Sequence, residues 1–114
     1  RKNNMNKIVS TLKELQLRCH SIAKAHGWWD KEVPVGTAIA LMHSELSEAL
    51  EAERNRVEKS EHIPEFTGLE EELADCVIRI LDYSGSRNLR LAEAIEAKIN
   101  FNERRSYRHG NKSF

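Results

Sequence analysis

Residues 69–84 read LEEELADCVIRILDYS, and this stretch decides the fold class. An α-helix advances by about 100° per residue, so residues three or four positions apart lie on the same face. At that spacing one apolar stripe forms from Leu69, Leu73, Cys76, Val77, Ile80 and Leu81. Nothing in the stretch alternates as a half-buried strand would. It therefore predicts an amphipathic helix, closed by Gly85-Ser86-Arg87.

The same period recurs three more times along the chain. It predicts helices over residues 6–26, 37–55 and 89–102, with Gly27 as a C-cap and Thr37 as an N-cap. The inward residues would be Ile8, Leu12, Leu15, Cys19, Ile22 and Ala23, then Ile39, Met42, Leu46, Ala49 and Leu50, then Leu91, Ala92, Ile95 and Ile99. We expect an all-α fold, a single domain over residues 1–114 built as a four-helix bundle.

Composition excludes several classes of protein. The 114 residues are 39% hydrophobic and 32% charged, with a net charge of zero, and no apolar run approaches the ~20 residues of a membrane span. The first residues lack the apolar segment of a secretory signal. Cys19 and Cys76 both fall on apolar stripes, which favours buried free thiols and a cytoplasmic protein.

The zero net charge hides an asymmetry. Residues 45–75 carry eleven acids against three bases, a net charge of −8, whereas residues 98–112 carry five bases against one acid, a net charge of +4. An acidic middle and a basic tail can neutralise each other, or they can divide the work of holding a cation and an anion.

Two helices each carry a pair of carboxylates. Glu45 and Glu48 lie three residues apart, as do Glu72 and Asp75, and each pair borders an apolar stripe. A single pair of this kind is usually a solvated face, but two pairs on successive helices converge if the helices pack antiparallel. Four converging carboxylates repel one another unless a cation lies between them, and oxygen ligands without His or Cys suit Mg²⁺, with Mn²⁺ as a substitute.

Basic residues follow on the last helix and the tail. Lys98 and Asn102 share one edge of that helix, and the tail supplies Arg105, Tyr107, His109 and Lys112. Guanidinium and ammonium groups bind phosphates, so these residues are candidates for a polyphosphate. A solvated tail or an RNA-binding tail are the alternatives, although nucleic acid is disfavoured because the domain is not net basic.

Together these residues resemble a known family. Glu45-x-x-Glu48 followed by Glu72-Leu-Ala-Asp75 is similar to the E-x-x-E…E-x-x-D signature of the MazG-like all-α nucleoside triphosphate pyrophosphohydrolases. The end of the chain, KINFNERRSYRHGNKSF, resembles the short single-domain type, with Ser106 in place of the usual Pro and Asn111 in place of a common Gly.

The resemblance implies a fold, a reaction and site residues. Such proteins form helical bundles completed by oligomerisation, as dimers or tetramers, and hydrolyse (deoxy)nucleoside triphosphates to the monophosphate and pyrophosphate in nucleotide-pool house-cleaning. By position, the four carboxylates would hold Mg²⁺, with Glu48 as the general base. Residues 98–112 would hold the phosphates through Lys98, Asn102, Arg105, Tyr107, His109 and Lys112. His20 and Trp29 match positions of the base and sugar pocket.

Two other functions compete with this one. The balanced charge and continuous stripes also suit a non-catalytic helical module that self-associates, and the sequence ERRSYRHGNK also suits a bundle with an RNA-binding tail. A separate observation favours self-association. Four short helices offer little area to bury four large aromatic residues, namely Trp28, Trp29, Phe101 and Phe114. We expect a homodimer or a homotetramer.

Overall fold

The computed structural model describes residues 2–105, with side chains from residue 7 onward. This part of the chain forms four helices, α1 (Lys2–Ala25), α2 (Val35–Arg54), α3 (Gly68–Ser86) and α4 (Leu91–Glu103), and contains no strand. The prediction of an all-α chain with four helices is therefore confirmed. None of the helices in residues 2–105 is long and apolar enough to cross a bilayer.

The predicted cap of α2 is wrong. The helix begins at Val35, with Pro34 in the cap position, and Thr37 already lies inside the first turn. The carbonyl of Pro34 accepts a hydrogen bond from the amide of Ala38 at 3.0 Å, so helical bonding starts there. Proline sets this boundary because its ring fixes φ near the helical value and it has no amide hydrogen to satisfy.

The end of α1 follows the prediction. Gly27 adopts a φ of +84°, the left-handed conformation that favours glycine after a helix. The amide of Trp28 then donates to the carbonyl of Ala23 at 3.1 Å, which closes the last turn.

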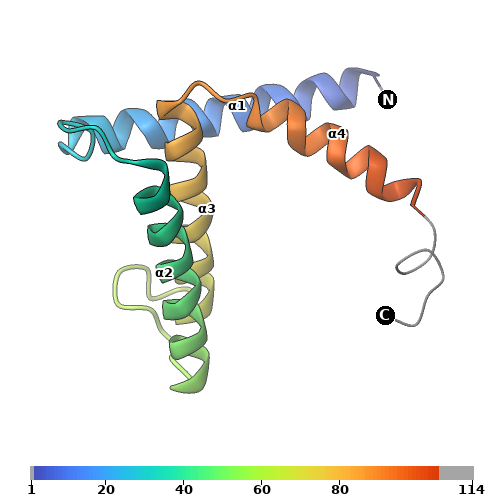
Figure 1. Cartoon of the computed structure of the whole chain (residues 1–114). Helices are drawn as coiled ribbons and strands as arrows, with labels where there is room; N and C mark the ends of the chain where they lie inside the picture. Colours follow the sequence, from blue (N-terminus) through green and yellow to red (C-terminus); the bar gives the residue numbers. More distant parts are fainter. Residues whose placement is uncertain (1, 106–114) are drawn as a thin grey trace.

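The helices form two arms (Figure 1). α2 and α3 run antiparallel as a hairpin, while α1 crosses the end of α3 and α4 extends along the other arm beside α1. Gly85 allows this crossing, because a Cβ at that position would lie 2.8 Å from the Cβ of His20. The two helix axes approach closely only where a side chain is missing.

The core of the single chain is thin. Its buried apolar residues are Ala38, Ala49, Cys76, Leu81 and Ala92, and among the described residues no large side chain is fully buried. The apolar stripes are present, but the chain leaves most of their large members exposed: Ile8, Leu15, Ile22, Ile39, Leu46, Leu50, Leu73, Val77 and Ile99. These residues, which were predicted to point inward, are therefore not covered within one chain.

The hairpin has two unlike sides. Ala38, Glu45 and Ala49 of α2 are buried in the hairpin, as is Cys76 of α3. In two antiparallel helices that face each other, the residue directly after a contact position turns to the same side of the pair on both helices. The residue directly before it turns to the opposite side. The first side is an apolar face of Ile39, Leu46, Leu50, Leu73 and Val77, each between 41% and 56% exposed.

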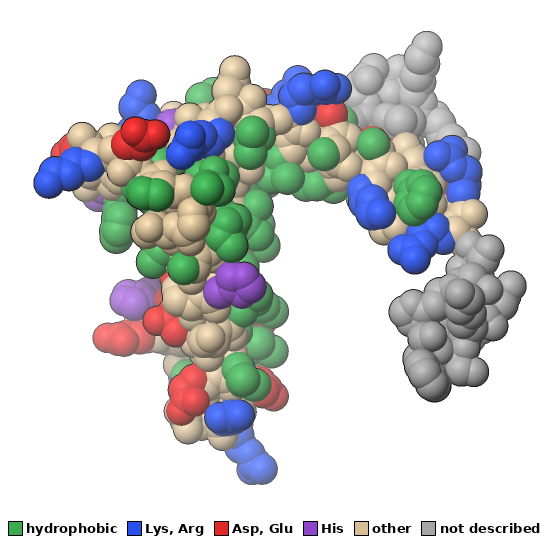
Figure 2. All heavy atoms as spheres, viewed as in Figure 1, with side chains coloured by type: hydrophobic (Ala, Val, Ile, Leu, Met, Phe, Trp, Pro, Cys, Tyr) green, Lys and Arg blue, Asp and Glu red, His purple; other side chains and the backbone are tan. Residues whose placement is uncertain are grey.

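Figure 2 shows this division. Apolar side chains run along one edge of the α2–α3 arm and continue beneath the other arm, whereas several acidic side chains and one histidine lie on the opposite edge. By helical spacing, the second side of the hairpin carries Glu48, Glu72 and Asp75, next to the buried Glu45.

Candidate metal centre

Three of the four predicted carboxylates converge. Glu45 of α2 and Glu72 and Asp75 of α3 each offer an oxygen, and these oxygens all lie within 4.8 Å of one another. Glu45 is buried, and the other two are half-buried.

Glu45 is the most constrained member of the cluster. Its Oε1 accepts a hydrogen bond from Nε of Arg79 at 2.8 Å, and its side chain is 8% exposed. Its second oxygen, Oε2, is buried and has no hydrogen-bond partner in the described part of the chain. A buried carboxylate oxygen without a partner is costly, so the site is suited to a group that would satisfy it, and a cation is such a group.

The close approach of these carboxylates shifts the pKa values of Glu72 and Asp75 upward. Burial, contacts with Glu45 and Glu48, and the charges of Glu48 and Asp75 raise the pKa of Glu72 to about 7. Burial and the charges of Glu45 and Glu71 also raise the pKa of Asp75. Burial alone would raise the pKa of Glu45, but the hydrogen bond from Arg79 and the proximity of the Glu48 and Glu72 carboxyl groups outweigh burial and lower it. Only part of the cluster is ionised at neutral pH.

Glu48 differs from its three partners. Its side chain is exposed and is not among the oxygens that converge within 4.8 Å, although it lies close enough to raise the pKa of Glu72. Its position at the edge of the cluster leaves its carboxylate open to solvent. Such a group can take part in proton transfer at the site without being fully engaged by a metal ion.

A cleft opens beside the cluster. It has a volume of about 420 Å³ and shares Glu45 and Asp75 with the carboxylate site. Its other lining residues are Cys19, Ile22, Ala23, His26 and Trp28 from the α1 region and Ile78, Arg79 and Asp82 from α3. A second hollow, lined by His62 and Glu71 among others, adjoins it through Asp75 and Ile78. A volume of this order accommodates a nucleotide-sized ligand.

His20 and Trp29 are brought together, but through a third residue. Oδ1 of Asp82 accepts hydrogen bonds from Nε1 of Trp29 at 2.8 Å and from Nδ1 of His20 at 2.9 Å. The two rings lie edge to face with centroids 5.5 Å apart. Neither residue lines the cleft, whereas Trp28 and His26 do. The joint bonding of His20 and Trp29 to Asp82 was not predicted from the sequence.

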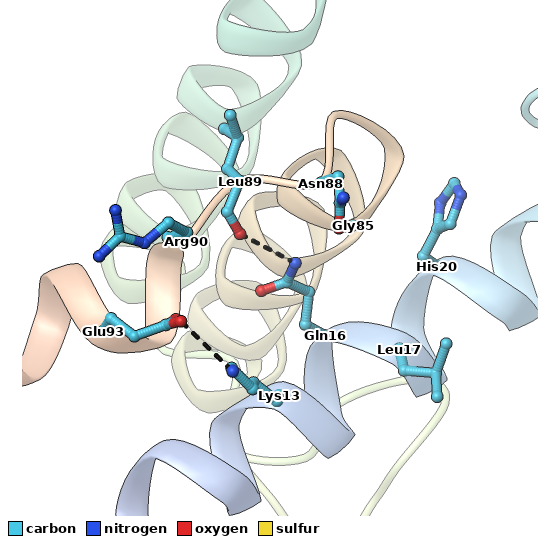
Figure 3. Close-up of a pocket in the computed structure, with 9 residues that line it drawn as sticks. All are labelled: Lys13, Gln16, Leu17, His20, Gly85, Asn88, Leu89, Arg90 and Glu93. Carbon is cyan, nitrogen blue, oxygen red and sulfur yellow. Dashed lines mark hydrogen bonds and ion pairs between the residues drawn. The ribbon is translucent and has the colours of Figure 1, made fainter.

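A separate cavity of about 530 Å³ lies where α1 passes the connection between α3 and α4 (Figure 3). Lys13 pairs with Glu93 at 3.3 Å, and Nε2 of Gln16 donates to the carbonyl of Leu89 at 3.3 Å. His20 is on its wall, but no carboxylate of the cluster is. Lys13 and Glu93 neutralise each other there, and the cavity lies at the junction between the two arms.

The predicted phosphate ligands lie on the other arm. Lys98 places its Nζ 4.5 Å from the ring centre of Phe101, and the guanidinium of Arg105 lies 5.9 Å from the same ring. Asn102 belongs to the same helix, α4, and accepts the amide of Arg105 through its carbonyl at 3.2 Å. Tyr107, His109 and Lys112 lie outside the described residues. Lys98, Asn102 and Arg105 therefore lie together near the end of α4, away from the carboxylate cluster of the same chain.

We expect the metal-free protein to lose stability as the pH rises from about 6 to 8. The pKa of Glu72 is about 7 in the folded chain against its usual 4.5, so the fold binds this proton more tightly than the unfolded chain does. The resulting stabilisation is full below pH 4.5 and is lost as the pH passes 7. Melting temperatures in a chelator at pH 6, 7 and 8 measure it.

The matched control for this prediction is Glu72→Gln, which removes the titration. Glu71 hydrogen-bonds to His62 and raises the pKa of His62, which acts in the same direction, so the informative quantity is the difference between the two proteins. The melting temperature of the variant should fall less between pH 6 and pH 8 than that of the parent. Equal slopes in the two proteins would contradict the prediction.

Comparison with known proteins identifies no relative: the chain matches no family model, no curated protein and no solved structure.

Proposed function

We propose that this chain is a divalent-metal-dependent hydrolase that converts a nucleoside triphosphate to the monophosphate and pyrophosphate. The observation that carries the proposal is the buried, unpartnered Oε2 of Glu45 inside a cluster of three carboxylates. Three acids at this spacing call for a divalent cation, and an all-oxygen set suits Mg²⁺ or Mn²⁺. Mg²⁺ typically binds together with substrate phosphates.

The cleft beside the cluster gives the substrate a place. With the triphosphate at Glu45 and Asp75, the remaining length of the cleft offers the indole of Trp28 to a base, since a flat aromatic face stacks on any base. Asp82 holds His20 and Trp29 in fixed orientations at the back of this region. We assign those two residues to the support of the base and sugar pocket.

The reaction is a hydrolysis at the α-phosphorus. Glu48 accepts a proton from a water molecule, the water oxygen forms a bond to the α-phosphorus, and the bond to the oxygen that bridges the α- and β-phosphates breaks. The electron pair of that bond leaves with pyrophosphate. A bound Mg²⁺ supplies charge neutralisation on the triphosphate and acidifies the water. The carboxylate of Glu48 suits proton transfer because it is exposed at the edge of the cluster and is not one of the three converging groups.

We propose that the basic residues serve the phosphates of a neighbouring copy. Lys98 and Asn102 lie on α4, and Arg105 lies just beyond its end; α4 packs beside α1 and extends away from the hairpin. A second copy can bring this helix end, together with Tyr107, His109 and Lys112, to the cleft. Cationic groups there would spread the negative charge of the leaving pyrophosphate.

Self-association is the second part of the proposal. The apolar face of Ile39, Leu46, Leu50, Leu73 and Val77 covers one side of the hairpin, and the chain has no large buried side chain of its own. A second copy can bury this face and complete the bundle as a homodimer or homotetramer. Since the carboxylates lie on the opposite side of the hairpin, such an assembly leaves them open to substrate.

The free thiols favour the cytoplasm as the compartment. Cys19 and Cys76 are both unpaired, and burial raises the pKa of Cys19 above its usual value. A thiol with a raised pKa is a poor nucleophile and remains reduced in a reducing compartment.

A panel of canonical and modified nucleoside triphosphates, each with and without Mg²⁺, tests the function. We expect equimolar pyrophosphate and monophosphate from at least one of them, only with the metal. Binding of Mg²⁺ with a non-hydrolysable nucleotide should also raise the melting temperature, by several degrees at a hundredfold excess over Kd. A non-catalytic association module predicts neither effect, so the absence of both would favour that alternative.

A further inference from the structure

Arg79 occupies a particular place between the cluster and the cleft. It lies one helical turn after Asp75 and just before Asp82 on the same side of α3. Its side chain is 33% exposed and lines both the 420 Å³ cleft and a smaller hollow near Trp28 and Trp29. Among the residues lining that cleft it is the one arginine or lysine.

One edge of the guanidinium is already engaged. Nε donates to Oε1 of Glu45 at 2.8 Å, which fixes both side chains. Within residues 7–105, the structure gives the two terminal amino groups of Arg79 no hydrogen-bond partner. The planar guanidinium carries five N–H donors on two edges, so it can bind a carboxylate on one edge and a second anion on the other.

The local charge favours such an anion once a metal ion is present. Three ionised carboxylates and one divalent cation leave a charge of −1, and Arg79 brings the site to zero. Without this arginine a polyphosphate would approach a site of its own sign, because Lys98 and Arg105 lie on the other arm. Within the described part of one chain, Arg79 is the one arginine or lysine lining the cleft that offsets this repulsion, and it is bonded to Glu45.

We propose that Arg79 is a phosphate-positioning residue: its terminal amino groups bind an oxygen of the polyphosphate that the metal holds, while Nε stays on Glu45. The two interactions tie the substrate to the carboxylate cluster in a fixed orientation. This inference rests on the proposed function and adds to it the group that sets where the phosphates lie in the cleft.

The test separates metal binding from phosphate binding. Titration calorimetry measures first the Kd of Mn²⁺ and then, at saturating Mn²⁺, the Kd of tripolyphosphate, which carries the phosphates without a base. In Arg79→Met we expect the affinity for Mn²⁺ to stay within about threefold or to tighten, since a nearby positive charge is removed. The affinity for tripolyphosphate should fall by about tenfold to a hundredfold, as for the loss of a charged hydrogen bond.

Two further variants complete the design. Arg79→Lys keeps the positive charge but loses the two donor edges of the guanidinium. Its affinity for tripolyphosphate should therefore lie between that of the parent and that of Arg79→Met. Arg54→Met removes the same charge from an exposed arginine at the end of α2 and should leave both constants unchanged. Circular dichroism checks that each variant is folded, and Arg79→Lys carries the test if Arg79→Met is not.

The outcomes are distinct. Unchanged tripolyphosphate affinity in Arg79→Met, or a loss of Mn²⁺ affinity alone, would overturn the proposal and leave Arg79 as a support for Glu45. If the parent protein binds no Mn²⁺, the metal centre itself fails, and the inference fails with it. If the parent binds Mn²⁺ and tripolyphosphate and Arg79→Met binds only Mn²⁺ normally, the inference stands.

Discussion

Asp75→Asn is expected to lower Mg²⁺-dependent pyrophosphate release by at least about a hundredfold, because even residues that only support metal ligands typically cost tenfold to a hundredfold when replaced. The substitution keeps the size of the side chain and removes one of the three oxygens that converge within 4.8 Å. Glu48→Gln should cause a comparable loss through the proton acceptor rather than through metal affinity. Initial rates at saturating Mg²⁺ and separate Mn²⁺ titrations distinguish the two.

Asp75→Asn should lose activity but keep or gain stability in the absence of a metal ion. Burial and the charges of Glu45 and Glu71 raise the pKa of Asp75, so its ionised form destabilises the metal-free fold. Asp75→Asn should therefore melt at the same temperature as the parent or higher at pH 8 in a chelator. A gain in stability with a loss of function is typical of a strained functional site.

Glu51→Gln is the matched control for these variants. Glu51 is also an acid of α2, but it is exposed and its carboxylate accepts from the side chain of Asn55 at 3.3 Å. Its replacement should leave pyrophosphate release within about twofold, as is usual for exposed positions away from special features. Full activity in both Asp75→Asn and Glu48→Gln would remove the basis of the proposed reaction.

Leu50→Glu is expected to break the assembly of the protein. Leu50 is 56% exposed in the single chain and lies on the apolar face one helical turn after Leu46. A second copy packed on this face would bury the new carboxylate without a partner, at a cost of several kcal/mol. The mass in solution should fall from a multiple of 13.1 kDa to that of one chain, and the melting temperature should drop by at least about 5 °C.

Ser47→Glu is the control for this change. Ser47 is exposed on the outward side of α2, so the variant adds the same charge to the same helix outside the apolar face. Light scattering coupled to size exclusion at micromolar concentration measures both proteins. A parent protein that is monomeric under these conditions would contradict the assembly, and so would an unchanged mass in Leu50→Glu.

The two experiments also test each other. The apolar face and the carboxylates occupy opposite sides of the hairpin, so a monomeric Leu50→Glu should still bind Mn²⁺ through Glu45, Glu72 and Asp75. Its phosphate affinity should fall if α4 of a second copy supplies Lys98 and Arg105. Retained Mn²⁺ binding with lost phosphate binding is the expected pattern.

Helical periodicity was a reliable guide to the elements of this chain. All four helices were predicted, because an amphipathic stripe is a local property that a single helix must satisfy by itself. The error at Thr37 was also local, because the helix begins at Val35 and Pro34 takes the cap position without any side-chain hydrogen bond.

The candidate site was predictable only in part. Spacing placed Glu72 and Asp75 on one face of α3, but the burial of Glu45 and the exposure of Glu48 depend on how far α2 is rotated against α3. The bond from Arg79 to Glu45 joins residues 34 positions apart, and that from Trp29 to Asp82 joins residues 53 positions apart. No local pattern encodes such partners. A weak signal did exist, since Arg79 and Asp82 continue the helical face of Asp75.

The sequence by itself determined four amphipathic helices and two carboxylate pairs at helical spacing, because backbone hydrogen bonding and side-chain periodicity act within a few residues. Only the tertiary structure decided that three of those acids meet, that Arg79 joins them, and that the apolar stripes remain uncovered in one chain. These features follow from the crossing of helices distant in sequence. That crossing depends on small contact residues such as Gly85 and Ala49, which allow two helices to approach closely. A small residue in the sequence does not reveal which helix packs against it.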